Sequence, residues 1–389
     1  LRKNLKILWQ NLQTNFWKKD IKSLESWAFD ALIFISRKAW KNMSQLYRKF
    51  LKETFDENQK LKAVDVCFDE NFNFAYDVVD VIAKETPDKR ALVYKSVSGE
   101  VTEFTFKQLS VLSNKMANVL KSTGIGRGSS VMLIMKRRYE FWIAMMALHK
   151  LGAVAIPTSH MVSGDDIAVR IAKADIKAII CVGSNEVCKC IEQAENKVSV
   201  NIDKYIVGEK RSGYTYISEL MEDASEQFDR VETSVHDNML YYFTSGTSGE
   251  PKAVIHDYSY PIAHIMTAKY WHGVIDNGLH LTVADSGWAK TAWGKLYGQW
   301  FCGCGVMVYD YEQFYANEIL QILDEQKITS FCAPPTIYKY LVREKINNYN
   351  LENLKMAVTA GEAMPTEVAD RFLQATGLKI REGLSLIHI

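Results

Sequence analysis

The sequence predicts an α/β fold with mostly parallel sheets, and two observations support this. From about residue 72 onward, short apolar or β-branched runs alternate with helical patterns of ten or more residues. The runs VMLIM at 131–135 and AIIC at 178–181 are continuously apolar, which is typical of strands covered on both faces. The length of 389 residues allows a large core and two or three domains or subdomains.

The N-terminal stretch, residues 1–55, is predicted to be helical because apolar residues such as Leu24, Ala28 and Ile35 recur at helical spacing. We interpret residues 1–42 as a helical extension. It is either non-native read-through upstream of a start at Met43 or an amphipathic segment that packs on the body or a partner. The main domain then covers residues 43–383.

Helices and strands follow in turn along the body of the chain. Helices are expected at 76–86 and 107–124, with further helices between the later strands. The expected strands are 91–95, 131–135, 153–158, 177–183, 204–208, 279–285, 305–310, 328–335 and 356–363.

Composition excludes several classes of protein. The net charge is +1, and the lysines and arginines are spread along the chain. This distribution does not suggest a nucleic-acid partner. No apolar run approaches the roughly 20 residues of a membrane span, and the start lacks the apolar stretch of a signal peptide. Seven cysteines, an odd number, indicate reduced thiols and a cytoplasmic location. Their C-x-C spacings differ from those of zinc sites, so no metal site is predicted.

The stretch YYFTSGTSGEPK at 241–252 is the strongest candidate for a binding site. Glycines let backbone N–H groups approach an anion, hydroxyls add donors, and a lysine adds a positive charge. The order differs from the Walker A loop, because Pro251 precedes the lysine and no Ser or Thr follows it. The candidate phosphate-binding residues are Thr244, Ser245, Gly246, Thr247, Ser248, Gly249 and Lys252.

This stretch resembles the phosphate-loop signature of the adenylate-forming superfamily, which includes acyl-CoA synthetases, adenylation domains of peptide synthetases and luciferases. Ser248 and Ala253 stand where the family usually has Thr and Gly. The resemblance covers about residues 43–383 and is nearest the medium-chain acyl-CoA synthetase branch. The further segments that carry it are 73–94, 141–159, 283–308 and 358–372.

The resemblance implies a large N-terminal adenylation domain, with two α/β subdomains, mostly parallel sheets and part of a β-barrel. It also implies ATP-dependent activation of a medium-chain fatty or aryl acid to an acyl-adenylate and then to an acyl-CoA thioester. The expected cofactors and co-substrates are ATP, Mg²⁺ and CoA, and the expected partners are small molecules.

Individual site residues follow from the same resemblance. The adenine-binding set is Gly361, Glu362, Ala363, Glu382 and Gly383, and the acyl-pocket set is Trp288, Lys290 and Trp293. An aromatic wall suits an apolar acyl or aryl tail. Trp293 is equally well explained as a core residue, and Lys290 as a solvated lysine. His160 and His256 fall near the expected site, and neither is assigned a catalytic role.

The sequence departs from the family after Glu382-Gly383, where Tyr-Gly-Gln-Thr-Glu is expected and LSLIHI follows. Those letters back-translate to CTG TCT CTT ATA CAC ATC, the transposase mosaic end used in library preparation. We therefore expect residues 384–389 to be a sequencing-adapter artefact; the alternative is an ordinary apolar C-terminal strand. The magnesium-binding Glu, the ribose-binding Asp and the C-terminal domain with its catalytic Lys would then be missing.

On this interpretation the 389-residue chain alone is incompetent for the full reaction. Two other functions stay open. One is an amino-acid-activating adenylation domain, for which Asp285 is a weak candidate ligand of the substrate ammonium. The other is a non-catalytic module that binds a nucleotide or a partner.

Overall fold

The computed structural model describes residues 46–245 and 251–383. The chain divides into two compact units. Of the described residues, 52–65 belong to one unit, and 46–51, 66–245 and 251–383 belong to the other. The expected extension at 1–42 and the suspected adapter at 384–389 lie outside the described residues.

The described part of the smaller unit belongs to a two-stranded sheet made by β1 (Leu51–Phe55) and β2 (Leu61–Val66). Asp56 shapes the turn, because its Oδ1 accepts the main-chain N–H groups of Asn58 at 2.9 Å and Lys60 at 2.8 Å. The helix expected through residue 55 is therefore wrong at residues 51–55. Burial alternates along β1, so strand pairing outweighs any local helical preference.

The larger unit contains two seven-stranded sheets, each parallel except for one antiparallel pair at an edge. The first sheet has the order β11-β10-β6-β5-β7-β8-β9 and the second has the order β16-β15-β14-β12-β13-β3-β4. In the first sheet the strands are β5 (Ser130–Ile134), β6 (Val154–Pro157), β7 (Ile176–Val182), β8 (Asp203–Val207), β9 (Thr215–Tyr216), β10 (Asn238–Ser245) and β11 (Pro251–Asp257). In the second they are β3 (Arg90–Lys95), β4 (Val101–Thr105), β12 (Leu279–Thr282), β13 (Gly305–Tyr309), β14 (Ser330–Cys332), β15 (Met356–Ala360) and β16 (Ile380–Gly383).

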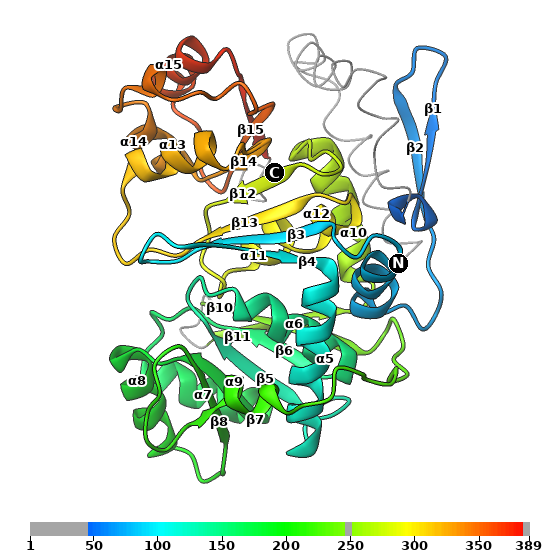
Figure 1. Cartoon of the computed structure of the whole chain (residues 1–389), viewed down its shortest axis with the longest axis vertical. Helices are drawn as coiled ribbons and strands as arrows, with labels where there is room; N and C mark the ends of the chain where they lie inside the picture. Colours follow the sequence, from blue (N-terminus) through cyan, green and yellow to red (C-terminus); the bar gives the residue numbers. More distant parts are fainter. Residues whose placement is uncertain (1–45, 246–250, 384–389) are drawn as a thin grey trace. The chain divides into compact units, whose positions relative to one another are not determined.

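The chain leaves the second sheet after β4, builds the whole first sheet, and then returns. On its return β13 pairs in parallel with β3, so that Val93 lies opposite Met307. This return connects segments that are far apart in the sequence, as the colours of Figure 1 show.

The helices vary from single turns to the 17 residues of α5. They are η1 (Leu46–Lys49), η2 (Ala75–Asp80), α4 (Val81–Glu85), α5 (Phe106–Ser122), α6 (Glu140–Leu151), α7 (Gly164–Ala174), α8 (Asn185–Glu195), α9 (Ile217–Glu222), α10 (Tyr260–Met266), η3 (Thr267–Trp271), α11 (Ala289–Lys295), α12 (Tyr297–Phe301), α13 (Ala316–Glu325), α14 (Pro335–Leu341), η4 (Ile346–Asn348) and α15 (Thr366–Thr376). Helix α5 begins with a capping box, in which Thr105 and Gln108 satisfy each other's main-chain N–H groups.

Two packing arrangements organise the larger unit. Helices α13, α14 and α15 contribute to one buried apolar cluster with β12, β13, β14 and β15, and they lie together in Figure 1. Helix α6 is buried at all 12 of its positions, as expected of a helix covered on every side. Its Trp142 donates Nε1–H to the carbonyl of Lys295 at 2.9 Å, and its His149 Nε2 lies 2.8 Å from the hydroxyl of Tyr297.

The predicted α/β class with mostly parallel sheets is confirmed. The antiparallel edge strands β4 and β11 were not predicted, and the strand expected at 328–335 ends at Cys332 because Pro335 begins α14. The strand orders of the described sheets do not test the expected part of a β-barrel, which stays a prediction.

Candidate functional site

The carboxyl ends of strands from the two sheets face each other within the larger unit. Ser286, which follows β12, donates its main-chain N–H to the carbonyl of Lys136, which follows β5, at 3.1 Å. Gly287 lies so close to the segment after β6 that an added Cβ would be 2.1 Å from the nitrogen of Ser159. Ligands of open α/β sheets bind outside the carboxyl ends of strands, so this is where a site is expected.

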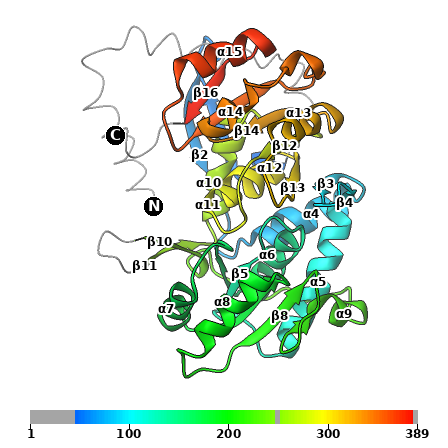
Figure 2. The same ribbon diagram turned by 90° about the vertical axis from the view of Figure 1, so that its left-hand side faces the viewer.

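The antiparallel hairpin of β10 and β11 holds both ends of the predicted phosphate-binding stretch. Thr244 pairs with Lys252 and Ser245 with Pro251, and Thr244 Oγ1 lies 3.5 Å from the carbonyl of Lys252. Both Thr244 and Lys252 are exposed. Figure 2 shows this hairpin beside α7. Four of the predicted residues, Gly246, Thr247, Ser248 and Gly249, lie outside the described residues.

One cation beside this hairpin was missed by the sequence reasoning. Arg170 of α7 places its guanidinium 5.3 Å from the ring centre of Phe243 on β10, and it donates to Thr158 Oγ1 at 3.3 Å. Its Nε is buried without a hydrogen-bond partner, and burial lowers the pKa of Arg170. Arg170 therefore connects the ends of β6 and β10, a contact that sequence spacing does not reveal.

The two predicted adenine-binding segments lie at the ends of neighbouring strands. Thr359 pairs with Glu382 and Ala360 with Gly383 in the parallel β15–β16 ladder. After β15, Gly361 adopts φ = 105°, a conformation that favours glycine. Two of the carboxylates accept hydrogen bonds: Glu362 from the hydroxyl of Thr336 and Glu382 from the main-chain N–H of Met364, each at 3.3 Å. Ala363, like Glu362, is exposed.

Gly383 connects the predicted adenine-binding set to the predicted acyl-pocket set. A Cβ on Gly383 would lie 2.7 Å from the indole of Trp271, so only glycine fits without displacing that ring. Trp271 in turn lies beside Trp293, with ring centres 5.6 Å apart, and both pack against Cys332, Met356 and Val358. The predicted residues Gly383 and Trp293 are thus brought together through a tryptophan that the sequence reasoning did not select.

The three predicted acyl-pocket residues have different surroundings. Trp288, just before α11, is 56% exposed. Trp293 stacks on His272, with ring centres 5.8 Å apart and planes inclined by 12°. Lys290 places Nζ 5.9 Å from the ring centre of Trp293. Trp293 is thus part of an aromatic wall, and Trp288 presents an exposed ring.

His272 is a neutral, buried histidine whose tautomer is set by its partner. Gln299 uses Oε1 to accept the main-chain N–H of Leu296, so its Nε2 donates to His272 Nδ1 at 3.1 Å. The proton of the neutral ring is therefore on Nε2, which is buried without a partner. Burial holds the pKa of His272 well below its ordinary value, and the neighbouring His280, Lys290 and His264 lower it further.

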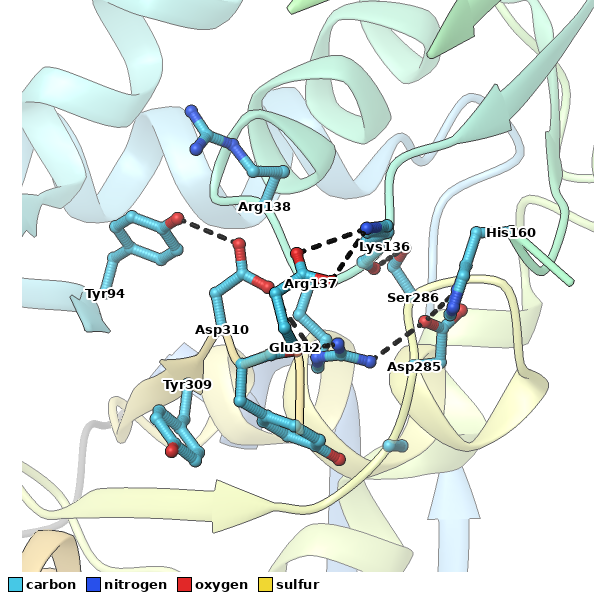
Figure 3. A network of polar contacts seen from close by, with 12 residues as sticks. Tyr94, Lys136, Arg137, Arg138, His160, Asp285, Ser286, Tyr309, Asp310 and Glu312 are labelled. Atoms are coloured by element: carbon cyan, nitrogen blue, oxygen red, sulfur yellow. Dashed lines mark hydrogen bonds and ion pairs between the residues drawn. The ribbon is translucent and has the colours of Figure 1, made fainter. Parts of the chain in front are cut away.

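A network of buried charges joins the strand ends (Figure 3). Arg137 lies after β5, and its Nη1 is 3.4 Å from Asp285 Oδ2, while its Nε is 3.7 Å from Asp310 Oδ1. The second distance is that of an ion pair longer than a hydrogen bond, and neither atom has a hydrogen-bond partner. The Arg137 guanidinium also lies 4.0 Å from the ring centre of Tyr311.

Further groups complete this network, which we call the Arg137 network: Arg137, Asp285, Asp310 and His160. His160 Nδ1 lies 3.0 Å from Asp285 Oδ2, and Asp285 Oδ1 accepts the N–H of Gly287 at 3.0 Å. Tyr94 donates to Asp310 at 3.2 Å, and its pKa is raised by burial and by the Asp310 charge. The sequence reasoning mentioned His160 and Asp285 separately and found no reason to pair them.

Two other predictions concern the second histidine and metals. His256 on β11 lies 4.0 Å from Tyr260 between ring centres, and burial lowers its pKa. These contacts do not indicate a chemical role for His256.

In the described ranges, no group of three or more His, Cys, Asp or Glu side chains is arranged to hold a metal ion. No helix within these ranges is long and apolar enough to cross a bilayer.

The sequence pattern of AMP-binding enzymes matches residues 79–384 of the chain. The chain therefore belongs to the AMP-binding enzyme family. Among curated proteins it is similar to the mitochondrial acyl-coenzyme A synthetase ACSM3 of Homo sapiens, with 33% identity over 323 residues, 81% of this chain and 55% of that protein. It is also similar to the mitochondrial acyl-coenzyme A synthetase ACSM4 of Rattus norvegicus, with 31% identity over 338 residues, 85% of this chain and 58% of that protein.

Solved structures show the same fold. The acyl-CoA synthetase of Brucella canis superposes with a TM-score of 0.73 at 21% identity, covering 81% of this chain and 58% of that one. A benzoate CoA ligase from Burkholderia xenovorans LB400 gives 0.68 at 19% identity, covering 81% and 61%. The chain spans a little over half the length of the relatives it matches, 55% and 58% for the two curated proteins.

Proposed function

We propose that the whole protein activates a carboxylic acid with ATP to give an acyl-adenylate and pyrophosphate, and then transfers the acyl group to CoA. Family membership and the names of the relatives support this proposal. The observation that carries it is the contact of Gly383 with Trp271 beside Trp293, because it places the candidate adenine and acyl segments next to each other. We further propose a medium-chain fatty or aryl acid as the substrate, since aromatic side chains form one wall.

The phosphate-binding role is proposed for the stretch held by the β10–β11 hairpin. Formation of the adenylate develops negative charge on the α-phosphate and on departing pyrophosphate, and N–H groups, hydroxyls and a lysine stabilise it. Lys252 suits this role because it is exposed on β11, opposite Thr244 near the carboxyl end of β10. The set consists of Thr244, Ser245, Gly246, Thr247, Ser248, Gly249 and Lys252.

Magnesium enters this proposal as part of the substrate, the magnesium complex of ATP. We assign no described residue to the ion, because the described carboxylates form no metal-binding group. The described residues are instead proposed to bind and orient the nucleotide: Gly361, Glu362, Ala363, Glu382 and Gly383 beside the adenine, and Trp288, Lys290 and Trp293 beside the acid.

The amino-acid-activating alternative is disfavoured by the surroundings of Asp285. That carboxylate already accepts the Gly287 N–H, pairs with Arg137 and contacts His160, so it has little capacity left for a substrate ammonium. A non-catalytic nucleotide-binding or partner-binding module remains the other alternative, and an activity measurement distinguishes it.

ATP–pyrophosphate exchange on the full-length protein is the direct test. We expect exchange with medium-chain or aryl acids and none with amino acids. Lys252→Ala should lower the exchange rate by about 10²-fold or more, in line with the loss of one stabilising group. Lys177→Ala, which changes a 52% exposed lysine away from the site, should leave it unchanged. Absence of exchange with every acid would support the binding module.

Two narrower expectations accompany this proposal. The 389-residue chain by itself should form no CoA thioester, and detectable thioester made by the purified chain would contradict that. The cytoplasmic location expected from composition is also a prediction. The curated relatives carry mitochondrial names, so cell fractionation with cytosolic and mitochondrial markers is the appropriate measurement.

A further inference from the structure

His160 is held by a carboxylate in an arrangement suited to acid–base chemistry. Its Nδ1 lies 3.0 Å from Asp285 Oδ2, and Figure 3 shows the two side chains facing each other. An ionised carboxylate only accepts hydrogen bonds, so in the neutral ring Nδ1 carries the proton and Nε2 carries the lone pair. A base oriented in this way by an aspartate is the arrangement used to accept protons from hydroxyl and thiol nucleophiles.

Asp285 is itself held in place from two directions. Its Oδ1 accepts the Gly287 N–H at 3.0 Å, and its Oδ2 faces the Arg137 guanidinium at 3.4 Å. The charged groups that contact His160 are therefore Asp285 directly and Arg137 through that carboxylate, within the described part of the chain. The His160 side chain is 24% exposed, and its Nε2 makes no hydrogen bond to a described residue.

The position of His160 relates it to both halves of the candidate site. On one side, Thr158 is bound by Arg170, whose guanidinium lies against Phe243 of the hairpin. On the other side, Ser159 lies against Gly287, the residue before Trp288. In an acyl-adenylate the reactive carbonyl joins the phosphate to the acyl group. On the proposed function, a side chain between the phosphate-binding and acyl-binding segments is expected near that carbonyl.

We propose that His160 is the general base of the second half-reaction and accepts the thiol proton of CoA at Nε2, with Asp285 as its positioning residue. This inference rests on the proposed function. The thiol S–H proton passes to Nε2, and the sulfur electron pair forms the C–S bond with the acyl carbonyl. The C–O bond to the phosphate then breaks and its electrons leave with AMP. The proton on His160 is released to solvent.

The test separates the two half-reactions of the full-length protein. Adenylate formation is followed by ATP–pyrophosphate exchange without CoA, and thioester formation is followed by single turnover after adding CoA to preformed acyl-adenylate. We expect His160→Gln to lower the thioester rate at pH 7 by about 10²-fold or more and to leave exchange within about twofold. His236→Gln is the matched control, because it changes a 70% exposed histidine that also faces a carboxylate.

The pH profile distinguishes a base from a residue that only shapes the site. The CoA thiol ionises without help only at alkaline pH, so the defect of His160→Gln should shrink about tenfold per pH unit as the pH rises toward the pKa of that thiol. A defect of constant size across the profile would overturn the proposal, as would a thioester rate equal to wild type at pH 7.

Asp285→Asn supplies a second, independent variant. It should lower the thioester rate at pH 7 by about tenfold or more, because the amide can stabilise the wrong tautomer of His160. A wild-type thioester rate in Asp285→Asn with intact exchange would overturn the positioning role. Failure of the proposed function has a different signature, since the wild-type protein would then show no exchange with any acid.

Discussion

The β10–β11 hairpin and the Arg137 network hold candidate-site residues in two contrasting ways. The hairpin holds Thr244 and Lys252 by main-chain pairing and leaves both side chains exposed. The network holds Arg137 and Asp310 with relative exposures of 9% and 4%, by pairing charges inside the protein. The comparison teaches that neighbouring parts of one candidate site can differ in what a substitution removes: the proposed ligand contact in the hairpin, and the stability of the fold at Arg137 and Asp310.

The largest expected effect tests this contrast directly. Arg137→Met leaves Asp285 and Asp310 buried without their cation and should lower the free energy of unfolding by about 3–5 kcal/mol. Lys252→Met, at an exposed position, should change it by less than about 0.5 kcal/mol. Urea denaturation of both variants provides the measurement. Equal losses in the two variants would show that the contrast is wrong.

A close approach between the two sheets gives the next largest effect. Gly287→Ala places a methyl group 2.1 Å from the nitrogen of Ser159, and backbone atoms cannot move aside easily. We expect a loss of about 1–3 kcal/mol in the free energy of unfolding, again by urea denaturation. Gly126→Ala is the control, because nothing lies within 4 Å of the added methyl and φ is not positive. A neutral Gly287→Ala would mean that the two segments separate readily.

The buried His149 gives a further test of buried against exposed groups, through the pH dependence of the free energy of unfolding. Burial lowers the pKa of His149 to about 3. Below its ordinary pKa of 6.5 the unfolded chain therefore binds a proton that the folded protein does not, and stability falls as the pH falls from about 6.5 toward 3. His149→Gln should reduce this slope by about 1.4 kcal/mol per pH unit. Urea denaturation between about pH 5 and pH 7 measures the slope, and an unchanged slope would contradict the assignment. The exposed His236 serves as control through His236→Gln.

The smallest expected effect on stability concerns the exposed tryptophan. Trp288→Ala should alter the free energy of unfolding by less than about 0.5 kcal/mol, because the ring is 56% exposed. If Trp288 lines the acyl pocket, the same variant raises KM for the acid in the exchange assay. Tyr315→Ala, at a 48% exposed aromatic residue outside the candidate site, should leave KM unchanged. Unchanged KM in both variants would remove Trp288 from the pocket.

The central strands could be predicted from the sequence because their residues are apolar on both faces. The expected runs at 131–135 and 305–310 correspond to β5 and β13, whose residues are all buried. The edge strand β11 could not be predicted in this way, since Lys252, Val254 and Ile255 are exposed and alternate with nothing buried. Its strand conformation depends on pairing with β10, a neighbour across a loop.

The candidate-site residues also fall into two groups: those that the sequence could identify and those that only the fold brings together. The hydroxyl-rich stretch could be selected because its members are adjacent in sequence. Arg137, Asp285 and Asp310 could not be grouped, because they follow three different strands in two sheets. Trp271 and His272 carry no local signal either, and only the stacking with Trp293 identifies them. Pairings of this kind arise from topology, which the order of residues encodes indirectly.

The pairing of β3 with β13 has a consequence for how the protein is made. Val93 leaves the ribosome early, and its partner Met307 emerges only after every strand of the first sheet has been synthesised. The second sheet therefore cannot close during synthesis until most of the larger unit exists, and its long-range contacts make folding slow. Until then β3 exposes an apolar edge that has not yet paired with β13. Expression of the protein should therefore depend on chaperones more than the size of the protein alone would suggest.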